Sequence, residues 1–201
     1  MKKMWQSFAC LALVLLLVGC SNYKFKPTTN YEIDDFSHTN QRGEEIALDD
    51  LKGKPWLAMF MFSSCTTVCP PMTDNMRFLQ ERLEEEGVTE YNIVGFSVDP
   101  TVDTPDVLAD YLYLFDVQDE SKWHLLTGYD QTYIEQFALN NFRAVVQKID
   151  GNDQVIHNTV FYLVDEKGVA VKNYAGYSAT SSKIPIDTIV EDMKALIEER
   201  L

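Results

Sequence analysis

The sequence predicts an α/β fold in which a central mixed sheet is flanked by helices. Residues 56–62 form a near-continuous apolar run, as expected of a strand that is buried on both faces. Apolar residues at helical spacing follow it over residues 72–83, and a second buried strand is predicted over 91–98. Strands that alternate with helices in this way build sheets covered by helices.

Local signals place the other elements. Residues 33–48 indicate two short strands around a turn at 40–43, which we expect to form an N-terminal β-hairpin extension. Thr104 and Pro105 suit the cap and first position of a helix. Leu125 lies in a short apolar patch to which we assign no element. The remaining predicted elements are a helix over 129–141, strands over 143–149, 159–164 and 169–174, and a C-terminal helix with an apolar face at Ile186, Ile189, Val190, Met193, Leu196 and Ile197. This order, which ends in a hairpin and a helix, is typical of a thioredoxin-like sandwich.

The N-terminus predicts export and lipidation. Lys2 and Lys3 precede an apolar stretch over residues 8–18, which is shorter than the roughly 20 residues needed to span a bilayer. Residues 17–20, Leu-Val-Gly-Cys, resemble a bacterial lipobox, in which Cys20 is lipidated and becomes the first residue of the mature chain. An uncleaved membrane anchor is the alternative, and the short apolar core argues against it.

We therefore expect three segments along the chain. They are a signal peptide over 1–19, a lipidated cysteine with a polar tether over 20–30, and one thioredoxin-like domain over 31–201. Two or more acyl chains would hold the protein stably on the extracytoplasmic face of a bacterial cell membrane.

The composition is acidic. The formal net charge is −14, and cleavage of the signal would remove Lys2 and Lys3 and no acidic residue, which lowers the charge to −16. An acidic surface argues against nucleic acid as a partner and suits a well-solvated domain, which we expect to be monomeric.

Cysteine usage leaves one dithiol in the mature chain. Cys10 lies inside the signal and lipidation would consume Cys20, so Cys65 and Cys69 are the free thiols that stay. They lie between the strand over 56–62 and the following helix, where reactive groups of α/β sheets gather and where a helix N-terminus favours a thiolate. A helical turn would place their α-carbons about 6 Å apart, within disulfide range. The same spacing lets both sulfurs bind one metal ion, and export permits a disulfide.

One of the three histidines is a candidate third group. His157 precedes the strand over 159–164, and in thioredoxin-like folds the loop entering this strand faces the active-site turn. His38 lies in a polar turn, where we expect it to be exposed, and His124 follows Trp123 and is assigned to packing or surface.

Three segments carry a family pattern in this order along the chain: residues 65–70 (Cys-Thr-Thr-Val-Cys-Pro), 97–105 (Ser-Val-Asp-Pro-Thr-Val-Asp-Thr-Pro) and 157–159 (His-Asn-Thr). Together they resemble the Sco (SenC) family of copper-binding proteins that assist cytochrome c oxidase assembly. The resemblance implies copper bound by Cys65, Cys69 and His157. It also implies that Asp99 lies near the site, where it tunes copper or meets a partner, and that the partner is cytochrome c oxidase subunit II.

The ligand chemistry agrees with copper. Thiolates are soft ligands that suit Cu(I), and an added imidazole also suits Cu(II), so we expect one copper per chain in either oxidation state. Zinc is the inorganic rival, since two cysteines and one histidine also match a three-ligand zinc site. Four methionines near the dithiol are better explained as core residues: Met59, Met61, Met72 and Met76.

Three other functions would use the same dithiol. A thiol–disulfide oxidoreductase would use Cys65 and Cys69 as catalytic residues, but such enzymes usually carry Cys-x-x-Cys and a proline where Asn158 stands. A peroxidase of the peroxiredoxin kind would match Thr66 and Cys69, but Phe62 stands where that motif has proline. A redox sensor is the third alternative. We therefore expect a metallochaperone, and thiol–disulfide oxidoreductase activity stays open.

Overall fold

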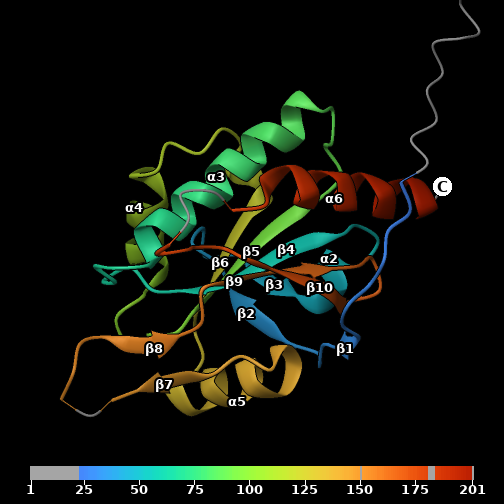
Figure 1. Cartoon of the computed structure of the whole chain (residues 1–201). Coiled ribbons are helices and arrows are strands. Elements are labelled where there is room, and N and C mark those ends of the chain that lie inside the picture. Colours follow the sequence, from blue (N-terminus) through green and yellow to red (C-terminus); the bar gives the residue numbers. More distant parts are fainter. Residues whose placement is uncertain (1–22, 150, 181–183, 201) are drawn as a thin grey trace, which may run out of the picture.

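The computed structural model describes residues 23–149, 151–180 and 184–200. Its strands are β1 (Tyr31–Glu32), β2 (Ser37–Thr39), β3 (Glu45–Ala47), β4 (Trp56–Met61), β5 (Asn92–Ser97), β6 (Trp123–Leu126), β7 (Val146–Lys148), β8 (Val155–His157), β9 (Val160–Val164) and β10 (Val169–Ala175). Its helices are α2 (Leu48–Leu51), α3 (Cys69–Glu85), α4 (Pro105–Tyr113), a short 3-10 helix η2 (Glu120–Lys122), α5 (Gln131–Phe142) and α6 (Ile186–Arg200) (Figure 1).

The main sheet is mixed and has six strands in the order β1-β10-β9-β4-β5-β6. Strands β4, β5 and β6 run parallel, whereas β9 is antiparallel to β4, and β10 and β1 continue the antiparallel half. Strands β2 and β3 form the predicted N-terminal hairpin as a separate ribbon. The predicted mixed sheet with a hairpin extension is therefore confirmed.

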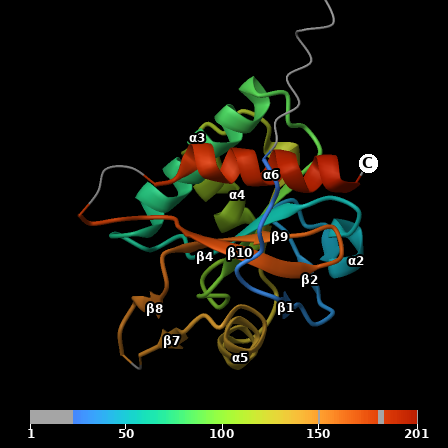
Figure 2. The same cartoon turned by 45° about the vertical axis from the view of Figure 1, so that its right-hand side comes forward.

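Helices cover both faces of this sheet. Helices α3, α4 and α6 lie on one face, and α5 lies on the other together with the β7–β8 hairpin (Figures 1 and 2). Helix α3 packs along α6 and is joined to α4 by a hydrogen bond of 2.7 Å between the hydroxyl groups of Thr73 and Tyr111. The layers confirm the α/β sandwich that the sequence predicts.

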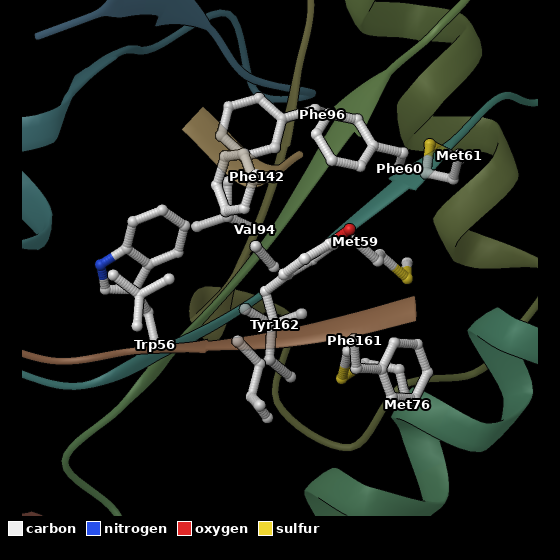
Figure 3. Close-up of a cluster of buried hydrophobic side chains, with 14 of the residues drawn as sticks. Trp56, Met59, Phe60, Met61, Met76, Val94, Phe96, Phe142, Phe161 and Tyr162 are labelled. Carbon is white, nitrogen blue, oxygen red and sulfur yellow. The ribbon is translucent and has the colours of Figure 1, made fainter. Parts of the chain in front are cut away.

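Strand β4 is the centre of the core. All six of its side chains are fully buried, because the strand has a neighbour on each side and helices on each face. Phe60 packs edge-on against Phe142 of α5 with ring centroids 5.4 Å apart, and Phe96 of β5 lies 5.7 Å from Phe60 (Figure 3). Four methionines are completely buried, as expected for core residues: Met59, Met61, Met72 and Met76.

Strands β1 and β8, helix α2 and the 3-10 helix η2 were not predicted, and two further segments differ from the prediction. The apolar patch around Leu125 is a full strand, β6, which pairs with β5 at the edge of the sheet. The strand predicted over 143–149 is limited to β7 and pairs with β8 in a separate two-stranded hairpin. Both segments are very short, and in such segments the pairing partner decides the structure more than the residue types do.

The chain before β1 lies along the main sheet. The backbone N–H groups of Thr28 and Thr29 both donate to the carbonyl oxygen of Val171 in β10, at 2.9 and 3.0 Å. Tyr23 donates from its hydroxyl group to a carboxylate oxygen of Asp192 in α6 at 2.5 Å. This part of the tether segment therefore contacts the domain.

The signal peptide and Cys20 lie outside the described residues. Within the part of the chain that the structure describes, no helix combines the length and the apolar character that crossing a bilayer requires.

We expect Phe60→Ala to lower the free energy of unfolding by about 3–5 kcal/mol, because it removes a fully buried ring and leaves a cavity between three aromatic neighbours. Urea unfolding followed by circular dichroism would measure the change. Tyr113→Ala is the matched control, since this aromatic side chain is 85% exposed and its removal should change the free energy by less than about 0.5 kcal/mol. Equal losses in both variants would contradict the placement of Phe60.

Candidate metal centre

The two cysteines lie where the chain leaves β4 and enters α3. Pro70 and Pro71 occupy the first helical positions after Cys69, where a missing N–H group breaks no helical hydrogen bond. Val68 provides no side-chain cap. Instead, the backbone N–H of Cys69 donates to the sulfur of Cys65 at 3.4 Å. The sulfur of Cys65 thus accepts from the positive end of the helix, which stabilises negative charge on it.

His157 reaches this turn from a distant part of the sequence. It ends β8 and stands three residues before β9, the strand that pairs with β4. Its Nε2 atom lies 3.2 Å from Sγ of Cys69, and its ring meets the ring of Phe62 edge-on at 5.8 Å. The two sulfurs and a ring nitrogen of His157 all lie within 4.8 Å of one another. The structure therefore brings together all three predicted ligands, with both cysteines as buried free thiols.

The hydrogen bond of His157 to the backbone fixes its tautomer. Nδ1 lies 2.8 Å from the carbonyl oxygen of Asn158, and a carbonyl oxygen can only accept, so Nδ1 carries the hydrogen. In the neutral ring the lone pair then belongs to Nε2, which faces Cys69. This is the usual arrangement of a metal-binding histidine, in which one ring nitrogen is held by an outer partner and the other is free to bind.

The two thiols differ strongly in acidity. A hydrogen bond from the Cys69 thiol, assisted by backbone N–H groups and opposed by burial, lowers the pKa of Cys65 to about 3. The same hydrogen bond is the main cause that raises the pKa of Cys69 well above its usual range, and burial of the side chain raises it further. At neutral pH the pair therefore holds one thiolate, on Cys65, and one proton, on Cys69.

Asp103 anchors the turn that carries the cysteines, a role that its residue type alone does not predict. Its carboxylate accepts from the backbone N–H of Ser63 at 3.2 Å and from the hydroxyl of Ser97 at 2.6 Å. Its carbonyl oxygen accepts from the hydroxyl of Thr127 at 2.6 Å. Asp103 is completely buried, and burial raises the pKa of its carboxyl group. The signal in the sequence was its position in the 97–105 segment, four residues after Asp99.

Asp99 lies outside the cluster of three ligand atoms. Its side chain is buried, and its carboxylate accepts from Nζ of Lys148 at 2.5 Å and from the hydroxyl of Thr101 at 3.1 Å. Asp99 therefore connects the end of β5 to β7, the first strand of the hairpin that ends in His157.

The other two histidines lie elsewhere. His38 is half-buried rather than exposed as expected, with Nε2 2.8 Å from the hydroxyl of Tyr133, and burial lowers its pKa to about 4. His124 is half-buried beside Arg42, and burial together with this guanidinium group lowers its pKa to about 4. Both are packing residues.

We expect Cys65, in the reduced and metal-free protein, to react with iodoacetamide at nearly the same rate from pH 5 to pH 8. Its lowered pKa keeps it a thiolate over this whole range, whereas an ordinary cysteine is only about one part in three thousand thiolate at pH 5. Cys69 should stay unmodified, since it is fully buried and its pKa is raised. Mass spectrometry of the labelled peptides would measure both rates.

Cys69→Ala is the control for this experiment, because it removes the hydrogen bond that contributes most to the lowered pKa of Cys65. The reaction of Cys65 should then become faster with rising pH. A tenfold rise per pH unit in the unmutated protein would contradict the asymmetry of the pair.

Comparisons with known proteins agree with this geometry. The SCO1/SenC family pattern matches residues 26–198. A SCO1/SenC family lipoprotein from Bacillus anthracis is 44% identical, with a TM-score of 0.80 over 87% of this chain and 99% of that one. BsSco, a member of the Sco family of cytochrome c oxidase assembly proteins with a disulfide switch, is 42% identical, with a TM-score of 0.77 over 87% of this chain and 98% of that one. Copper-bound ScoI of Bradyrhizobium japonicum is 27% identical, with a TM-score of 0.67 over 82% of this chain and 99% of that one. The chain belongs to the SCO1/SenC family.

Proposed function

We propose that this protein is a lipid-anchored copper-binding protein that assists assembly of the binuclear copper centre of cytochrome c oxidase. The observation that carries the proposal is the cluster of two sulfurs and one imidazole nitrogen within 4.8 Å. Family membership supports it, since a related structure holds copper and another relative belongs to the oxidase assembly proteins.

The donor set fits copper in both oxidation states. In this proposal Cys65 and Cys69 hold copper through their sulfurs, and His157 holds it through Nε2. Two thiolates and a neutral imidazole leave Cu(II) formally uncharged and suit Cu(I) through their soft sulfurs. Zinc would bind the same three residues, but Cu(II) exceeds zinc in the usual affinity order of divalent ions.

The proposed location and partner follow from the N-terminus and the family. Lipidation of Cys20 after removal of residues 1–19 would place the domain on the extracytoplasmic membrane face, and a relative of the same family is a lipoprotein. Subunit II of cytochrome c oxidase is the proposed partner, because it carries the binuclear copper centre. Copper bound by two sulfurs and an imidazole can pass by ligand exchange to another site made of cysteine and histidine.

The acidity of the two thiols also favours a second activity of the same dithiol. A thiolate on Cys65 with a protonated thiol on Cys69 is the arrangement that attacks a partner's disulfide, with Cys69 then closing a disulfide to Cys65 and releasing the reduced partner. The protein would in that case reduce the cysteines that receive copper, either instead of delivering the metal or before delivering it.

We expect the reduced full-length chain to bind one Cu(II) with a sulfur-to-copper charge-transfer band. Cys65→Ser and Cys69→Ser should each abolish the band. His157→Ala should lower the affinity for Cu(II) more than the affinity for Cu(I), because imidazole contributes more to Cu(II) binding. Titration followed by absorption would measure stoichiometry and affinity. His38→Ala is the matched control and should bind like the unmutated chain, and disulfide-bonded protein should bind no copper. Two coppers per chain, or unchanged Cu(II) binding by His157→Ala, would refute the ligand set.

We expect a strain that lacks the gene to lose assembly of the oxidase with the binuclear copper centre and to keep quinol oxidases that lack this centre. Cytochrome c oxidation by isolated membranes and the copper content of the oxidase would be measured at limiting copper. Re-expressed Cys65→Ser, Cys69→Ser or His157→Ala should fail to restore activity, while His38→Ala should restore it. A fully copper-loaded oxidase in the deletion strain would rule out the assembly role.

A further inference from the structure

The hairpin that ends in His157 is separate from the main sheet. Strands β7 and β8 pair with each other in a two-stranded sheet beside α5 (Figures 1 and 2). Its inner face contributes Val146 and Val155 to the core, while Ile156 on the outer face is half exposed. The register of β9 on β4 sets where the hairpin joins the sheet, and the attachment of the hairpin itself then sets the final position of the His157 imidazole.

One charged contact attaches the hairpin to the end of β5. Nζ of Lys148 lies 2.5 Å from Oδ1 of Asp99, and the Asp99 side chain is only 1% exposed. Lys148 is also the residue that pairs with Val155 across the hairpin, and the next pair on the same face is Val146 with His157. Fixing Lys148 thus fixes the strand segment that ends in the imidazole.

Other polar contacts attach the hairpin at other points. Nε2 of Gln154 donates to the carbonyl oxygen of Ser64 at 3.3 Å in an exposed position, and the backbone N–H of Lys148 donates to Glu135 of α5 at 3.0 Å. By contrast, loss of the Lys148 ammonium group would leave the buried Asp99 carboxylate without its counter-ion, which is strongly unfavourable. Losing the ion pair therefore costs the attachment of the hairpin at the end of β5 more than losing the exposed bond of Gln154 would.

We propose that Lys148 is a positioning residue for the metal centre: its ion pair with Asp99 acts as a latch that holds the β7–β8 hairpin, and with it Nε2 of His157, against Cys69. Opening the latch withdraws the imidazole and leaves the two sulfurs in place, because the cysteine turn is held separately by Asp103. In this arrangement His157 is held by the hairpin, and its attachment does not depend on the turn that holds Cys65 and Cys69.

The test compares four variants of the full-length chain, reduced and metal-free in detergent. In Lys148→Met, amide exchange of β8 should be at least about tenfold faster than in the unmutated chain, and the NMR signal of His157 Nε2 should move to that of a solvent-exposed imidazole. Amides of α3 and β4 should keep their rates. After copper addition, Cu(II) affinity should fall about 10–100-fold, the usual effect of losing a partner that orients a ligand.

Three further variants separate the latch from a general loss of stability. Asp99→Asn with Lys148→Met leaves no unpaired buried charge, so global stability should recover while β8 still exchanges fast. Lys148→Arg keeps the charge and should restore slow exchange. Lys172→Met breaks a comparable buried pair, Lys172 with Asp192 at 2.6 Å, away from the hairpin, and should leave β8 and Nε2 unchanged.

The latch would be overturned if Lys148→Met kept the β8 exchange rates and the His157 Nε2 signal of the unmutated chain. It would also be overturned if Lys172→Met changed both readouts as much as Lys148→Met does. The exchange and imidazole readouts need no copper. If the unmutated chain failed to bind copper, the proposed function would be refuted. The exchange and imidazole readouts would still show whether the ion pair positions His157.

Discussion

The pairing of β9 with β4 is the contact on which the rest of the site depends. The cysteine turn follows β4 directly, whereas His157 is 88 residues further along the chain than Cys69. The two meet because Ala58 pairs with Tyr162 and the strands run antiparallel, so the end of one lies beside the start of the other. A slip of two residues in this register would move the imidazole by about 7 Å. The contact of 3.2 Å with Cys69 would then be lost.

The same geometry makes metal binding and redox chemistry compete for one pair of atoms. The proton shared between Cys65 and Cys69 must leave before both sulfurs can bind a metal ion as thiolates. Oxidation to a disulfide consumes the same electrons that thiolate ligands would donate. A metal ion bound through both sulfurs would therefore exclude the disulfide, and the disulfide would exclude the metal ion until a thiol reduces it.

The fold and the grouping of Cys65, Cys69 and His157 could be predicted from the sequence, but the groups that support this cluster could not. Residues 56–62 are apolar without interruption, and a short run of this kind is typical of a central strand that is buried on both faces. The dithiol could be recognised because the sequence has only two other cysteines, Cys10 and Cys20, and both lie in the N-terminal segment. Asp103 stood out in the sequence only as part of the 97–105 segment, and Lys148 did not stand out at all. Charged residues are usually exposed, and only the folded chain shows which of them pair with a buried group. The short strand β6 was missed for a related reason, because four residues acquire strand structure through β5.

The segment before β1 would limit how far the domain could move from a lipid attached at Cys20. Tyr23 and Thr28 are both bonded to the domain, so the first docked side chain, that of Tyr23, belongs to the third residue after Cys20. Three residues extend over at most about 11 Å. A lipid at Cys20 would therefore keep the domain close to the membrane surface, and the domain would meet a membrane-bound partner by lateral diffusion. Such confinement raises the effective concentration of two membrane-bound partners without any gain in their intrinsic affinity.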